Sequence, residues 1–273
     1  MLGTQLENVR RTSPLIHCIT NYVTVNDCAN VLLACGASPI MADDLEEMDE
    51  MSAICSGLVI NIGTLNRRTI TSMEAAGKAA RKLGHPIILD PVGAGASQLR
   101  TQTACTIMQE VHPTVIRGNI SEIKSLFQGR GTTKGVDADS ADQVTEENLQ
   151  DAVALVKSWA QDIGCIIAVT GAIDIICDGS TAYCVRNGHP LMARVTGTGC
   201  QLSALMAAFV SANGQQALGA VVAAACTMGL AGEIAHRRLS PQEGNASYRN
   251  HIIDAVCNLS AADLEAGARY EVR

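Results

Sequence analysis

The stretch Pro86-Ile87-Ile88-Leu89-Asp90-Pro91 decides the fold class, because it is a short apolar run that lies between two prolines and ends in an acid. A run of this length without polar alternation is typical of a strand buried on both faces of a parallel sheet. Four other runs have the same character: Ser38–Ala42, Gly57–Gly63, Thr114–Asn119 and Cys165–Gly171. The sequence therefore predicts a mainly parallel central sheet.

Helical patterns lie between these runs. The predicted helices are Asp44–Ser56, Thr69–Leu83 and Thr145–Ala160, followed by an almost entirely helical last third from Thr198 onward. The runs Ile173–Asp178 and Thr181–Val185 predict an antiparallel hairpin at the sheet edge. This alternation predicts a doubly wound, three-layer α/β/α fold with helices on both faces of the sheet. No linker divides residues 1–273, so we expect a single domain.

Composition narrows the classes of function. The net charge is −7 and no Lys/Arg-rich run occurs, so nucleic acid is not an expected partner. The 11 cysteines are scattered without a C-x-x-C pair, which predicts neither a disulfide framework nor a zinc site and fits a reduced, cytoplasmic compartment. The first 25 residues carry charges and predict no signal peptide.

One long uncharged stretch, 201–232, raises the question of a membrane span. The residues Asn213-Gly214-Gln215-Gln216 interrupt it, and each remaining piece is shorter than the ~20 residues that a span requires. We therefore expect two buried helices and no membrane association.

The most informative motif is Val195-Thr196-Gly197-Thr198-Gly199-Cys200, which precedes an apolar helix. Glycines followed by a helix start can direct several backbone N–H groups at one anion, such as a migrating phosphoryl group. A helix start also lowers the pKa of a thiol, so Cys200 is a candidate general base. On spacing alone, the commoner meaning is a Gly-rich turn with Cys200 as a small packing residue.

Two further motifs place polar groups where a strand ends. Asp90, at the end of its strand, can hold Mg²⁺ directly or through water, or can simply bond to its own turn. In Arg117-Gly118-Asn119-Ile120-Ser121-Glu122, Arg117 can clamp phosphate and Glu122 can add a carboxylate near the metal. The same spacing makes Asn119 and Glu122 a helix capping box, and both roles can hold together.

The fourth segment runs from His17 to Met41. It contains the polar cluster His17-Cys18-Ile19-Thr20-Asn21 and then Asn26, which on its own reads as a helix cap. On its own, Met41 at the end of a strand indicates a residue that packs in the hydrophobic core. No G-x-x-x-x-G-K-[ST] sequence occurs, which excludes a P-loop enzyme, and Gly93-Ala94-Gly95 lacks the third glycine of a dinucleotide site.

Taken in order, these segments resemble the hydroxyethylthiazole kinase family of the ribokinase-like superfamily over nearly the whole chain. The matching runs are Pro14–Asn21, Gly36–Ala42, Asn61–Leu65, Leu89–Gly95, Ile116–Ile123, Val169–Gly171 and Val195–Cys200. The resemblance implies transfer of the γ-phosphoryl group of ATP to 4-methyl-5-(2-hydroxyethyl)thiazole for thiamine salvage. It also implies a homotrimer with the substrate pocket between neighbouring subunits.

The resemblance implies roles for individual residues. It implies that Cys200 is the catalytic residue, at the position where most ribokinase-like enzymes carry an Asp. The implied substrate-binding residues are Met41, Gly197, Asn21 and Asn26. The implied ATP-binding residues are Arg117, Thr170 and Gly199. The implied ligands of Mg²⁺ are Asp90 and Glu122.

Some positions depart from the family pattern. Cys18 stands where Asn is usual, Gly244-Asn245-Ala246-Ser247-Tyr248 replaces G-P-G-S-F, and the polar loop Gln128–Asp142 is longer than usual. Three alternative functions stay open. Two keep the fold: a kinase for hydroxymethylpyrimidine or pyridoxal, and an ATP- or ADP-dependent dehydratase. The third is a nucleotide-binding regulatory protein without turnover. Cys200 in place of Asp disfavours the first two.

Overall fold

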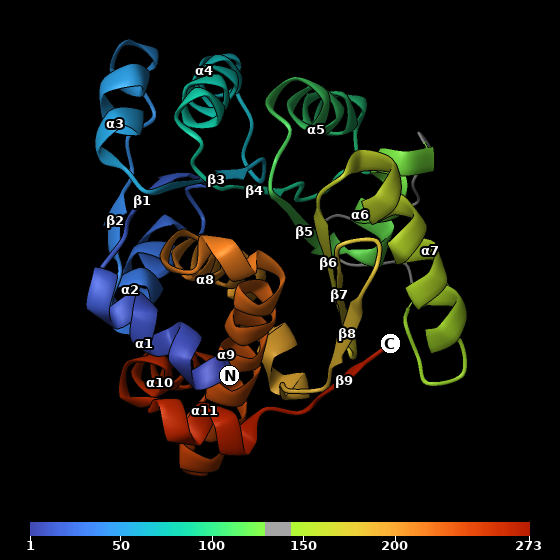
Figure 1. The fold of residues 1–273 in the computed structure, drawn as a ribbon. Helices are drawn as coiled ribbons and strands as arrows, with labels where there is room; N and C mark the ends of the chain where they lie inside the picture. Colours follow the sequence, from blue (N-terminus) through green and yellow to red (C-terminus); the bar gives the residue numbers. More distant parts are fainter. Residues whose placement is uncertain (129–142) are drawn as a thin grey trace.

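Within the described part of the chain, the strands form one nine-stranded sheet in the order β2-β1-β3-β4-β5-β6-β7-β8-β9 (Figure 1). The computed structural model describes residues 1–128 and 143–273. Pairing is parallel from β2 to β6 and antiparallel from β6 to β9. The strands are β1 Leu15–Ile19, β2 Ser38–Ile40, β3 Gly57–Asn61, β4 Ile87–Asp90, β5 Val115–Asn119, β6 Ile166–Thr170, β7 Asp174–Cys177, β8 Ala182–Val185 and β9 Tyr270–Val272.

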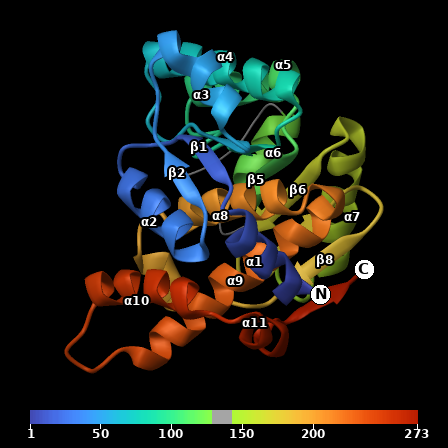
Figure 2. The same cartoon turned by 60° about the vertical axis from the view of Figure 1, so that its left-hand side comes forward.

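Helices cover both faces of the sheet, which gives three layers (Figures 1 and 2). One face carries η1 Leu45–Glu47, α3 Met48–Ile54, α4 Arg67–Leu83, α5 Gln98–Val111, α6 Ile120–Gln128 and α7 Leu149–Ile163. The other carries α1 Leu2–Thr12, α2 Val25–Cys35, η3 Pro190–Arg194, α8 Thr198–Ala212, η4 Gly214–Gln216, α9 Ala217–Arg238, α10 Asn245–Asn258 and α11 Ala261–Gly267.

The central strands explain this layering. Every residue of β3 and of β4 is buried. Alternate residues point to opposite faces, so Val59 and Ile88 join the core under α8 and α9, whereas Ile60 and Leu89 join the core under α4 and α5. Since both faces are apolar, the sheet is stable only with helices on both sides, and the three-layer prediction is confirmed.

The five predicted parallel strands are confirmed with ends that differ by one or two residues. The strand β1 was not predicted, because His17 interrupts its apolar run with a polar side chain. The predicted helix 44–56 is divided into η1 and α3, and the predicted helix 145–160 begins later, at Leu149. The predicted loop Gln128–Asp142 lies, apart from Gln128, outside the described residues.

The predicted hairpin forms as β7 and β8, but its place at the sheet edge was wrong. The C-terminal strand β9 pairs with β8 and takes the edge position. Sequence spacing gave no signal for β9, because it has only three residues and lies in a polar C-terminal segment.

The uncharged stretch forms α8 and most of α9, with η4 between them. The helix α9 is long and apolar enough to span a bilayer, but most of its residues are buried inside the protein. The prediction of two buried helices is therefore confirmed.

Candidate functional site

The carboxyl ends of β3, β4 and β5 lie beside the first turn of α8, which packs against β1, β3 and β4. Gly197 caps α8 with a φ of 87°, in the left-handed region that favours glycine. A Cβ at this position would also overlap the side chain of Thr24. Gly197 thus allows a tight turn immediately before α8, and this turn places Cys200 in the first turn of the helix.

Two side-chain amides converge on the sulfur of Cys200. The Nδ2 atoms of Asn21 and Asn61 both donate to Cys200 Sγ, each at 3.3 Å. Asn21 lies in the turn after β1, and Asn61 is the last residue of β3. Residues from three distant segments therefore meet at one partly buried thiol.

The predicted lowering of the Cys200 pKa was wrong. Burial raises the pKa of this thiol above its ordinary value of 9.0, and the nearby charge of Asp90 raises it further. The hydroxyl of Thr24, the guanidinium of Arg117 and the amide of Asn21 oppose that rise without cancelling it. Loss of water on burial outweighs these opposing contacts, so Cys200 is a neutral thiol at neutral pH.

Asp90 is the central acid of the site and is fully buried. Its Oδ2 accepts from Ser203 Oγ at 2.8 Å and from Asn61 Nδ2 at 2.9 Å, and it lies 3.5 Å from Arg117 Nη1. Its Oδ1 has no hydrogen-bond partner in the described part of the chain. Burial raises the pKa of Asp90, although Arg117, Ser203 and Asn61 act against the rise.

Arg117 reaches from β5 to the start of α8. Its Nη2 donates to Thr170 Oγ1 at 2.6 Å, so the two residues predicted to bind ATP are in contact. A Cβ on Gly199 would overlap the Arg117 guanidinium. The absence of a side chain at 199 therefore lets the cation lie against the first turn of α8.

Glu122 makes the predicted capping box, which is confirmed. Asn119 N–H donates to Glu122 Oε2, and Glu122 N–H donates to Asn119 Oδ1, both at 2.8 Å. Glu122 Oε1 accepts from Gly93 N–H at 2.7 Å, which joins the turn after β4 to α6. Burial, and then the charge of Asp90, raise the pKa of Glu122 to about 7.

Met41 lines a second, small cavity of about 180 Å³. The wall of this cavity is formed mostly by the segments after β1 and β2 and by the start of α4. Its lining residues are Cys18, Thr20, Tyr22, Val25, Met41, Asp43, Thr64, Asn66, Arg68, Thr69 and Met73. Because Thr20 and Tyr22 flank Asn21, this cavity adjoins the residues around Cys200.

Asn26 is the predicted site residue that makes none of these contacts. It is exposed, and both its backbone oxygen and Oδ1 accept from Asn30 Nδ2. Its interpretation as a helix cap was wrong, because Thr24 occupies the N-cap position of α2. Thr24 and Asn26 are both short polar residues that can cap a helix. Only the path of the backbone decides which of them is the N-cap of α2.

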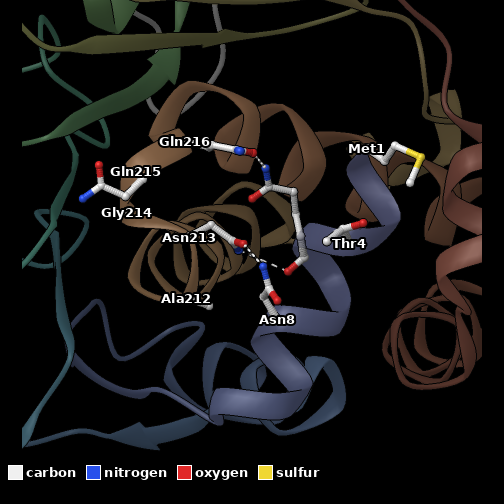
Figure 3. A pocket seen from close by; sticks show the side chains of 9 residues that line it. Met1, Thr4, Asn8, Ala212, Asn213, Gly214, Gln215 and Gln216 are labelled. Carbon is white, nitrogen blue, oxygen red and sulfur yellow. Dashed lines mark hydrogen bonds between the residues drawn. The ribbon is translucent and has the colours of Figure 1, made fainter.

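A larger cavity of about 350 Å³ lies between α1 and the turn that joins α8 to α9 (Figure 3). Neutral amides line it and pair with one another: Asn8 Nδ2 donates to Asn213 Oδ1 at 2.7 Å, and Gln5 Nε2 donates to Gln216 Oε1 at 2.9 Å. None of the predicted site residues lines this cavity. Its contacts fasten α1 to the rest of the protein.

Sequence reasoning missed Asn61, Ser203 and Thr24 as members of the site. Asn61 had a usable signal, since it ends a buried parallel strand just as Asp90 does. Ser203 and Thr24 had none, because a hydroxyl on a buried helix or in a turn is common in any core.

Comparison with known proteins assigns the family. The profile of the hydroxyethylthiazole kinase family matches residues 6–262. A hydroxyethylthiazole kinase from Clostridium acetobutylicum is 60% identical over 271 residues, which cover 99% of both chains. Another, from Ruminiclostridium cellulolyticum, is 50% identical over 93% of this chain and 91% of its own.

Solved structures agree. The structure of a hydroxyethylthiazole kinase protein from Pyrococcus horikoshii superimposes with a TM-score of 0.89 at 36% identity and covers 100% of this chain and 98% of its own. A pyridoxal kinase from Staphylococcus aureus, at a TM-score of 0.61 and 14% identity over 95% and 97% of the two chains, shares the ribokinase-like fold alone. The chain is thus a kinase and belongs to the hydroxyethylthiazole kinase family.

Proposed function

We propose that this protein transfers the γ-phosphoryl group of ATP to the hydroxyl of 4-methyl-5-(2-hydroxyethyl)thiazole. The observation that carries the proposal is the convergence on Cys200, at the start of α8, of two amide donors beside the Asp90–Arg117 pair. Phosphoryl transfer depends mainly on positioning and on compensation of charge, and both are provided here.

In the proposed reaction, the substrate hydroxyl lies beside Cys200 Sγ. The thiolate form of Cys200 accepts the hydroxyl proton as the oxygen attacks the γ-phosphorus and the bond from that phosphorus to ADP breaks. The first backbone N–H groups of α8, from Gly197 to Cys200, face the transferring group, because a helix start leaves them without intrahelical partners. Arg117, held by Thr170 and close against Gly199, neutralises phosphate charge.

The carboxylates of Asp90 and Glu122 fit a divalent cation such as Mg²⁺. Asp90 Oδ1 is buried and unpartnered among the described residues, and burial, followed by the charge of Asp90, raises the pKa of Glu122. Positive charge near the two acids would relieve this repulsion. When bound with ATP, the cation would neutralise the phosphate oxygens, and both acids would hold it directly or through water.

The thiazole ring is proposed to bind in the cavity beside Met41, with Asn21, Asn26 and Gly197 at or near the substrate. Tyr22, which lines this cavity, and Val23, the next residue in the chain, are both exposed. This exposed pair supports a homotrimer in which a neighbouring subunit covers the pocket. We further propose that residues 1–273 act as one kinase domain in the cytoplasm.

The purified protein, Mg²⁺-ATP and the thiazole alcohol should give ADP and the thiazole phosphate, detected by mass spectrometry. Hydroxymethylpyrimidine and pyridoxal serve as competing alcohols in the same assay. Preferential phosphorylation of either, or hydrolysis of ATP without any phosphate ester, would contradict the proposal. Light scattering on the same sample measures the proposed trimer.

A further inference from the structure

The amide of Asn61 uses its full hydrogen-bonding capacity within the site. It is the last residue of β3 and is 1% exposed. Its Oδ1 accepts from Gly63 N–H at 2.9 Å and from Asn21 Nδ2 at 3.0 Å. Its Nδ2 donates to Asp90 Oδ2 at 2.9 Å and to Cys200 Sγ at 3.3 Å. An asparagine side chain has two N–H donors and two oxygen lone pairs, and all four are engaged.

The orientation of this amide is fixed by its surroundings. A backbone N–H can only donate, so the Gly63 contact requires the oxygen of Asn61 on that side and the NH₂ group on the side of Asp90 and Cys200. Asn21 is fixed in the same way, because its Oδ1 accepts from the backbone N–H groups of Val23 and Thr24. Both amides therefore present N–H groups, not oxygens, to Cys200 Sγ.

The turn that follows Asn61 is also held in place. Arg100 donates to the carbonyl oxygens of Ile62 at 3.1 Å, Gly63 at 2.7 Å and Val92 at 2.6 Å. One guanidinium thus ties the turn after β3 to the turn after β4, and hence Asn61 to Asp90. Charge-assisted bonds of this kind are stronger than those between neutral groups.

We propose that Asn61 is a positioning residue: its single NH₂ group fixes the Cys200 sulfur and the Asp90 carboxylate relative to each other. The bonds from Asn21 and Asn61 take up sulfur lone pairs, so the thiol proton is directed away from both amides. When that proton leaves, the same two N–H groups stabilise the charge on sulfur. The inference rests on the proposed function only in assigning the proton transfer to Cys200.

The test measures Cys200 itself, in the free protein without substrates. The rate of alkylation by iodoacetamide is followed against pH, and peptide mass spectrometry identifies the modified cysteine. In Asn61→Ala, the midpoint for Cys200 should move upward by about one pH unit or more, because the thiolate loses one of its two amide donors. Asn187→Ala removes an amide that bonds to Glu233 and Gly267 and is the matched control, with an unchanged midpoint.

A second variant distinguishes loss of the two N–H donors of Asn61 from disruption of the fold. In Asn61→Ser, the hydroxyl oxygen can still accept from Gly63 N–H, but the serine side chain is too short to reach both Asp90 and Cys200. This variant should also raise the midpoint, and it carries the test if Asn61→Ala does not fold. An unchanged or lower midpoint in a variant with wild-type circular dichroism overturns the proposal.

Kinetics give an independent readout. Asn61→Ala should lower kcat about tenfold or more with little change in KM for ATP, and the loss should shrink in a Cys200→Ala background. A loss of equal size in both backgrounds would show that Asn61 does not act through Cys200 and would overturn the proposal. The alkylation assay needs no substrate, so it tests the role of Asn61 even if the protein makes no thiazole phosphate. Failure of this inference and failure of the proposed function are therefore distinguishable.

Discussion

Helix α8 carries a polar cluster at each end, and the two clusters differ in kind. Near its start lie the buried acids Asp90 and Glu122, and the pKa values of Cys200, Asp90 and Glu122 are all raised. At its end, beside the larger cavity, neutral amides such as those of Asn8 and Asn213 pair with one another (Figure 3). We therefore place the candidate site at the start of α8, although the larger cavity lies at its end.

The largest expected difference between the two ends concerns the reaction. Cys200→Ala should lower kcat by about 10²–10⁴-fold, the usual cost of losing a general base, with little change in KM for ATP. Cys200→Asp should keep substantial activity, because a carboxylate can accept the same proton. Asn8→Ala, at the other end of α8, should keep the wild-type kcat. Equal kcat values for the wild type and Cys200→Ala would show that Cys200 is not the proton acceptor.

The pH profile sharpens the same contrast. Since the pKa of Cys200 is raised above 9.0, only a small fraction of the protein is thiolate at pH 7, and that fraction grows with pH. We expect kcat of the wild type to rise from pH 7 to pH 9. Cys200→Asp should have a flatter profile, because carboxylates ionise at much lower pH. A falling wild-type profile would contradict Cys200 as the proton acceptor.

A pair of glycines makes the next comparison. Gly199→Ala would push the Arg117 guanidinium away from Thr170 and Asp90, whereas a Cβ on Gly214 would meet nothing within 4 Å. We expect Gly199→Ala to raise KM for ATP about tenfold or more, the cost of losing a charge-assisted contact, with a small change in stability. Gly214→Ala should change neither quantity. Steady-state kinetics and thermal unfolding of both variants test this.

The buried acids predict a pH-dependent stability. The folded pKa of Glu122, about 7, exceeds its ordinary value of 4.5, so its favourable contribution is complete below pH 4.5 and is lost as pH rises through 7. Relative to Glu122→Gln, the wild type should lose up to about 3 kcal/mol of stability over this range. Denaturant unfolding of both proteins at pH 5 and pH 8, without ligands, measures it. A difference that is constant with pH would exclude a raised pKa for Glu122.

The smallest effect belongs to the amide-lined end of α8. Asn8→Ala removes the bond to Asn213 and should cost about 0.5–1.5 kcal/mol of unfolding free energy. Urea unfolding quantifies this loss. A fall in kcat comparable to that of Cys200→Ala would mean that the two ends of α8 are functionally coupled.

Much of the site was predictable from local sequence. The carboxyl ends of parallel strands share one edge of the sheet, and the two motifs predicted at strand ends, around Asp90 and Arg117, come together there. The Asn119–Glu122 capping box depends on three-residue spacing alone and was also predicted. What could not be predicted were contacts across long sequence separations: Asn21 and Asn61 lie 179 and 139 residues from Cys200.

The sequence by itself determined the strand runs, the burial of both sheet faces and the glycine turn that starts α8, because each depends on residues that are neighbours in the chain. Only the tertiary structure decided that β1 lies between β2 and β3, that β9 takes the sheet edge, and that the pKa of Cys200 moves upward. Strand order and desolvation both depend on which distant segments pack together, and no local pattern records that packing.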